Sequence, residues 1–144
     1  MIPQAGRSLA DLAMKLAGDI APATQTEYAA ANAGLMAMLL LALAQEHERA
    51  AAVRTMDIDE MKLLFRAAQN EHPEAPGAGQ RASYCEREPK SLLLSDLDRF
   101  HGEGLQALIA LHAWAEAEDA GLDRRIWDFL LRHTERHKFE LPPL

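Results

Sequence analysis

The chain has 144 residues, 49 % hydrophobic and 26 % charged, which is the composition of a folded globular domain rather than a disordered segment. Its 22 Asp and Glu outnumber its 15 Lys and Arg, so a nucleic-acid partner, which usually needs a basic face, is not expected. The single cysteine, Cys85, excludes an intrachain disulfide, and the N-terminus lacks the pattern of a signal peptide. We therefore expect an acidic, cytoplasmic protein of one domain, residues 1–144, whose composition suits a bacterial genome.

The first two predicted helices lie in the N-terminal third of the chain. One runs from Ser8 to about Asp19 and ends before Pro22. The next begins at Thr24, whose capping-box partner is Glu27, and continues through an apolar run at 29–44 that contains neither proline nor β-branched residues. A helix that is apolar on all sides must be buried on all sides. The sequence thus predicts a long buried central helix at about 24–55, covered by the rest of a bundle or by a second copy of the chain.

The same apolar run bears on membranes and on assembly. It spans about 16 residues, fewer than the roughly 20 needed to cross a bilayer, so no membrane partner is expected. Asn32 is the one properly polar residue within it. A polar residue in an apolar seam can fix the register of a helix pair, and the alternative is a core position bonded to a backbone group.

The rest of the chain predicts three more helices and one long break. Asp57, with Glu60, is interpreted as the cap of a third helix, although a bend of the central helix at this point is the alternative. Prolines and glycines then predict an irregular loop at about 71–94, either a mobile connector or a lid over a site. A fourth helix follows at 95–118 and a fifth at 124–138. With no strand pattern anywhere, the fold class is all-α, a bundle of four to five helices.

Histidines and carboxylates on these helices supply the candidate ligand-binding residues. His101 and His112 lie eleven positions apart, close to three helical turns, so they share one face of the fourth helix. Such histidines can bind a metal inside a bundle or can be core residues bonded to carboxylates. The chain lacks the Glu-x-x-His motif of di-metal bundles, so no metal ion or cofactor is expected. A pocket between the central and fourth helices would be lined by Glu46, His47, His101, His112 and Glu116.

A second pair of histidines, His133 and His137, lies one turn apart near the C-terminus. The zinc-protease pattern His-Glu-x-x-His fails here, because Glu135 lies two residues after the first histidine and points to another side of the helix. The pair could still chelate a metal. The favoured interpretation is that these residues and their basic neighbours complement the helix dipole.

Two functional hypotheses follow from the sequence. The first is a non-catalytic helical bundle that acts through protein contacts, as a homodimer, because the central helix is so apolar and no catalytic motif is assembled. The second is a bundle that binds a metal or a small ligand, or an enzyme, with the 71–90 segment covering the five residues named above. The sequence predicts no specific cellular process.

Overall fold

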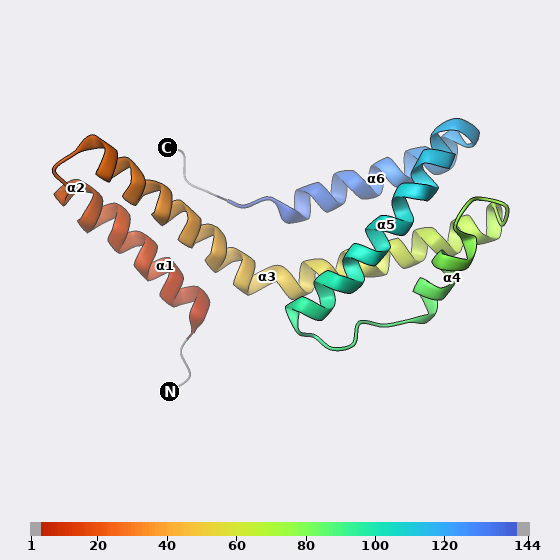
Figure 1. Cartoon of the computed structure of the whole chain (residues 1–144), viewed down its shortest axis with the longest axis horizontal. Helices are drawn as coiled ribbons and strands as arrows, with labels where there is room; N and C mark the ends of the chain where they lie inside the picture. Colours follow the sequence, from red (N-terminus) through yellow and green to blue (C-terminus); the bar gives the residue numbers. More distant parts are fainter. Residues whose placement is uncertain (1–3, 141–144) are drawn as a thin grey trace. The chain divides into compact units, whose positions relative to one another are not determined.

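The computed structural model describes residues 4–140, and all regular structure within them is helical, which confirms the all-α prediction (Figure 1). The chain divides into two compact units, each described here by itself. Unit 1 contains the described residues 4–50 and 139–140, and unit 2 is Ala51–Lys138. The single domain expected over residues 1–144 stays a prediction.

The central helix, α3, is longer than expected. It runs from Glu27 to Glu71, 45 residues, and passes from unit 1 into unit 2. The predicted end near residue 55 is wrong, because nothing between Gly34 and Pro73 breaks a helix. The Thr55 hydroxyl donates to the Ala51 carbonyl, 2.9 Å away, so this side chain stays within the helix. Asp57 does not cap a new helix.

The expected burial of α3 is also wrong for its first half. There only Ala33, Ala37 and Ala50 are buried, while Leu35 and Leu39 are 59 % and 61 % exposed. By length and composition α3 could cross a membrane, and only 11 % of its most apolar 18-residue stretch is buried. Composition predicted helix formation correctly, but burial requires a neighbouring layer on every side.

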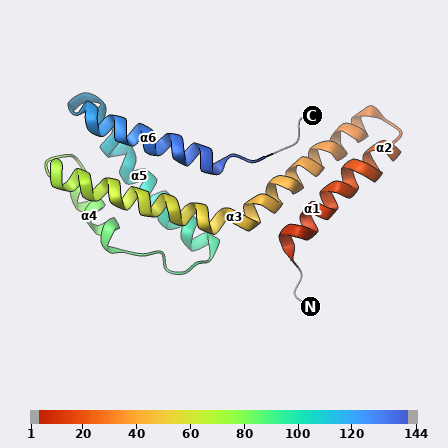
Figure 2. The same ribbon diagram turned by 180° about the vertical axis from the view of Figure 1, so that it is seen from behind.

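Unit 1 is built on a pair of neighbouring helical segments (Figures 1 and 2). α1 (Ala5–Lys15) continues through a π-helical turn, η1 (Leu16–Ile20), into the short α2 (Ala21–Ala23). The predicted stop before Pro22 is wrong, because this proline occupies the first turn of α2, where a missing N–H is tolerated. The following helix is capped by Thr26, whose hydroxyl accepts from the Ala29 N–H at 3.1 Å.

Unit 2 is formed by the second half of α3 together with α4 (Ala78–Glu86), α5 (Leu94–Glu118) and α6 (Ala120–His137). Its core includes Met61 and Phe65 of α3 and Leu111 of α5, all fully buried. The irregular loop predicted at 71–94 contains α4, which is a correction. α4 follows a left-handed Gly77 and lies in a stretch without proline or glycine after Gly79.

Two local contacts set the positions of the helices around this core. The Tyr84 ring of α4 stacks on Phe100 of α5, with ring centroids 4.4 Å apart. Between α5 and α6, Asp119 accepts a hydrogen bond from the Leu122 N–H at 2.8 Å. Asp119 therefore caps α6, and the helix begins at Ala120, four residues before the start predicted at residue 124.

Candidate metal centre

The candidate site is centred on Asp57, in the middle of α3. This residue lies one and two turns from Met61 and Phe65, on the core-facing side of the helix, and its side chain is 0 % exposed. An ionised carboxylate in such a position is costly unless charged or hydrogen-bonding groups compensate for the lost water. The structure must supply those groups from neighbouring helices.

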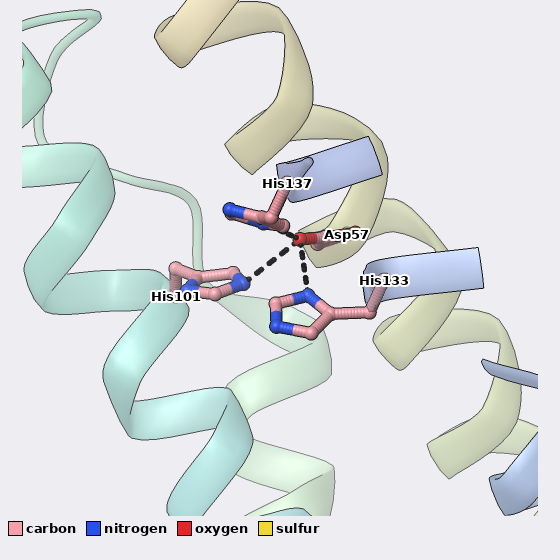
Figure 3. Close-up of side chains that lie close together, drawn as sticks. All are labelled: Asp57, His101, His133 and His137. Carbon is pink, nitrogen blue, oxygen red and sulfur yellow. Dashed lines mark hydrogen bonds and ion pairs between the residues drawn. The ribbon is translucent and has the colours of Figure 1, made fainter. Parts of the chain in front are cut away.

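Three histidines meet at one oxygen of this carboxylate (Figure 3). His101 Nε2, from α5, lies 3.1 Å from Asp57 Oδ2. From α6, His133 Nδ1 lies 2.7 Å and His137 Nε2 2.8 Å from the same oxygen. One nitrogen of each ring and the Asp57 oxygen all lie within 4.8 Å of one another. Three helices thus deliver four potential metal ligands to one point.

The second oxygen of Asp57 is held by an arginine. Arg136 Nε lies 2.8 Å from Asp57 Oδ1, and the same guanidinium contacts Glu60 through Nη1 at 2.8 Å. Arg132 Nε reaches Glu60 Oε2 at 3.2 Å. This outer layer fixes the plane of the Asp57 carboxylate and leaves Oδ2 for the histidines. Hydrogen bonds of this kind, which orient the residues that coordinate an ion, are typical of metal sites.

Electrostatics keep the carboxylate ionised. Burial raises the pKa of Asp57, but hydrogen bonds from His101, His137, His133 and Arg136 outweigh it, so the pKa lies far below the usual range. Burial is the largest influence on His133 and lowers its pKa, against the opposing effect of Asp57. These low pKa values favour an anionic Asp57 carboxylate and a neutral His133 imidazole, which are the forms of the two groups that bind metal ions.

The donor set fits a tetrahedral transition-metal ion. Zinc prefers imidazole nitrogen and carboxylate oxygen at about 2.0–2.2 Å, which places neighbouring ligand atoms roughly 3.3 Å apart. The nitrogen-to-Oδ2 distances of 2.7–3.1 Å are those of hydrogen bonds, so each would lengthen by a few tenths of an ångström to reach that spacing. Without an ion, three imidazole N–H groups must share a single carboxylate oxygen. Small rotations of these side chains would admit a metal between them.

Of the five residues proposed from the sequence, the three on α5 fall into two groups within unit 2. His101 belongs to the Asp57 cluster, and 8 % of this residue is exposed. His112 and Glu116 come together in a second, more open group with Asp123, whose Oδ1 lies 3.1 Å from His112 Nε2. The two α5 histidines are about 16 Å apart along the helix.

Glu46 and His47 are part of unit 1. Glu46 is half-buried and has interaction partners, and His47 is exposed beside Gly6. The structure therefore brings His112 and Glu116 together, and places His101 with Asp57, His133 and His137 instead.

The sequence predicts part of the Asp57 cluster but not its central residue. The His133–His137 pair was recognised as a possible chelate, and Glu135 does point elsewhere, pairing with Lys138. Asp57 is not among the predicted ligands, because the sequence pattern indicates a helix cap at this position. The available signal was its spacing of four and eight residues from Met61 and Phe65, which places a carboxylate on an apolar stripe.

No family model matches this chain, and neither a curated protein nor a solved structure matches it.

Proposed function

We propose that this protein binds one divalent transition-metal ion, best zinc, through Asp57, His101, His133 and His137. The observation that carries the proposal is the convergence of three imidazole nitrogens on one fully buried carboxylate oxygen. Hydrogen bonding alone satisfies that carboxylate with fewer donors. Four ligands from three helices form the arrangement that a metal ion requires.

The ligand count favours a stabilising role over a catalytic one. Catalytic zinc sites usually keep a coordination position for water, whereas four protein ligands close the tetrahedron. Asp57 lies on α3 and His133 and His137 on α6, about 80 residues later, while His101 lies on α5. A bound ion would join these helices directly. The folded state of unit 2 would then depend on metal supply, because metal binding free energy becomes folding free energy.

The donor chemistry also limits the choice of metal. Imidazole suits zinc, copper, nickel and cobalt, whereas calcium and magnesium prefer sites made of oxygen ligands. Cys85, the only cysteine, lies on α4 and is not in the cluster, so the site offers no thiolate for copper(I). Zinc is the natural probe, and cobalt(II) is its spectroscopic substitute.

The test is a zinc titration of untagged, chelator-treated protein, followed by native mass spectrometry and calorimetry. We expect one zinc per chain, with a Kd of tens of nanomolar or below, as for structural zinc sites. His101→Ala and Asp57→Asn should abolish this binding. His72→Ala is the matched control, since His72 belongs to unit 2 but contacts Asp119 and Glu74 rather than the cluster.

Two outcomes would overturn the proposal. Wild-type protein that takes up no stoichiometric zinc would make the cluster a hydrogen-bond network around a buried carboxylate. Zinc binding that survives His101→Ala but disappears in His112→Ala would assign it to the more open group. Cobalt(II) supplies an independent check, because a tetrahedral nitrogen and oxygen site gives a visible spectrum that an octahedral surface site does not.

A further inference from the structure

The first half of α3 presents its large apolar side chains to solvent along one line. At 100° per residue, six positions fall within a sector of about 100°. The five apolar members are 46–78 % exposed, and Asn32 is exposed among them. These residues, called the α3 stripe below, are Tyr28, Asn32, Leu35, Met36, Leu39 and Leu43.

The opposite side of the same helix is occupied within unit 1. There the buried positions of α3 are Ala33 and Ala37, and the buried residue of α1 is Ala13. Gly6 of α1 lies close to the backbone of Ala44, so that a Cβ on Gly6 would be 3.5 Å from the Ala44 carbonyl oxygen. The fully buried positions on this side are therefore alanines, whereas the leucines and methionine of the α3 stripe stay exposed.

The exposed area is of the size that a dimer needs. A fully exposed side chain of this size has about 200 Å², so the stripe offers roughly 600 Å² of apolar surface, against about 800 Å² per partner in a standard protein interface. That is the upper end of the largest apolar patches on monomeric proteins. The flanking residues of α3 would supply the remaining area.

The charge of unit 1 and the position of Asn32 distinguish a protein partner from a lipid surface. The described residues 4–50 and 139–140 contain three Lys and Arg against six Asp and Glu, which repels anionic lipid headgroups. The uncharged run at 28–45 has a helical length of about 27 Å, close to the roughly 30 Å of a bilayer core, so charge and polarity rather than length separate the two kinds of surface. An Asn32 amide placed in lipid would also lose its hydrogen bonds to water.

A second copy of the chain satisfies each of these features. Tyr28, Asn32, Leu35 and Leu39 are spaced by four, three and four residues, the spacing of a helix-pairing seam. In a parallel pair, Asn32 meets its own counterpart and each amide can bond the other. In an antiparallel pair centred on the stripe, Asn32 would face Leu39 and stay unpaired. The single polar residue of the stripe thus selects the parallel register.

We infer that the α3 stripe binds the same stripe of a second copy of this chain, with the two helices parallel and in register at Asn32. The interaction is independent of the metal centre, because the stripe lies in unit 1 and the four metal ligands lie in unit 2. This gives a specific basis for the homodimer expected from the sequence.

The experiment compares the full-length wild type with Leu39→Asp by analytical ultracentrifugation over a range of concentrations. We expect a dimer for the wild type and a folded monomer for Leu39→Asp, with dimer affinity reduced on the order of a hundredfold or more. Leu63→Asp is the matched control, because Leu63 is a leucine of the same helix, 64 % exposed, outside the stripe. It should dimerise like the wild type, and circular dichroism should show that both variants keep their helices.

Cross-linking tests the register in a Cys85→Ala background. Tyr28→Cys and Leu43→Cys lie at opposite ends of the stripe. Disulfides require Cα atoms within about 7 Å, so a parallel pair cross-links each variant with itself. An antiparallel pair would instead join the two variants to each other in a mixture, which would overturn the register.

Two further results would overturn the dimer itself. One is a wild-type protein that stays monomeric at the highest concentration reached. The other is flotation with vesicles of phosphatidylcholine and phosphatidylglycerol that is lost in Leu39→Asp. The first would leave the stripe without a second copy, and the second would assign it to a lipid surface.

Discussion

The two halves of α3 are one continuous helix in two opposite environments. In unit 2, Ile58, Met61 and Phe65 are at most 2 % exposed, and so is the charged Asp57. In unit 1, Leu35 and Leu39 are about 60 % exposed, although the sequence around them is far more apolar than the sequence around Asp57. Burial is therefore decided by which helices pack nearby rather than by local hydrophobicity. A carboxylate can occupy the core where histidines and arginine meet it, while leucines remain outside.

The largest expected effect concerns the proposed zinc ion of unit 2 and its removal. Zinc present at a thousand times its Kd stabilises the folded state by about 4 kcal/mol. For a unit of this size the corresponding rise in Tm is roughly 15–30 °C. Calorimetry of zinc-loaded and chelator-treated protein should show this difference for the transition of unit 2, and His101→Ala should remove it. If zinc raised the Tm of His101→Ala as much as that of the wild type, the stabilisation would not come from the proposed site.

Matched truncations in the two halves should differ almost as strongly. Phe65→Ala, in the buried half, should lower the free energy of unfolding by about 3–5 kcal/mol. Leu39→Ala, in the exposed half, should change it by no more than about 0.5 kcal/mol in dilute protein. Urea titrations followed by circular dichroism measure both. For Leu39→Ala a larger loss should appear only at concentrations where the wild type is dimeric; a large loss in dilute protein would show that Leu39 is buried within one chain.

A pair of glycines on α5 gives a smaller and more local contrast. A Cβ at Gly104 would lie 2.5 Å from Tyr84 Oη and 2.7 Å from Met61 Cε, whereas one at Gly102 would meet nothing within 4 Å. Gly104→Ala should therefore cost about 1–3 kcal/mol through overpacking. Gly102→Ala should instead stabilise the helix by about 0.5–1 kcal/mol. Thermal denaturation of the two variants compares them, and equal shifts would show that Tyr84 moves aside without cost.

The smallest expected effect concerns the junction of α5 and α6. The N–H of Leu122 donates to Asp119 and is the main cause of the lowered pKa of that carboxyl. Because the folded-state pKa is depressed, this contribution is present above the unfolded pKa of about 3.9 and is lost as the pH falls below it. Asp119→Ala should lower Tm by a few degrees at neutral pH and by less near pH 3. Asp119→Asn, which also caps helices well, should retain most of the stability at both pH values.

The candidate site shows how far sequence reasoning reaches. The one-turn spacing of His133 and His137 is a local property, so the pair could be recognised without a structure. Asp57 precedes His133 by 76 residues, and no local pattern indicates that these side chains meet. The sequence pattern around Asp57 is typical of a helix N-cap. That interpretation is wrong, because α3 continues through Asp57 to Glu71.

The sequence by itself determined the all-α class, the presence of a helix at 29–44 and the position of α5. Each depends on backbone propensities and on interactions within a few residues: alanine, leucine and methionine favour helix, and the stretch from Leu94 to Glu118 contains no proline. These forces act within single segments and are therefore visible in the order of residues.

Only the tertiary structure decided which faces are buried and which ligands meet. Asp57 became a core residue because α5 and α6 bring histidines and Arg136 to it, and the α3 stripe remained exposed because α1 covers the alanine side. Burial and ligand contacts depend on the packing of helices that are distant in sequence, because one helix provides the side chains that cover or pair with those of another. The sequence of a single helix does not show which surface will pack against it.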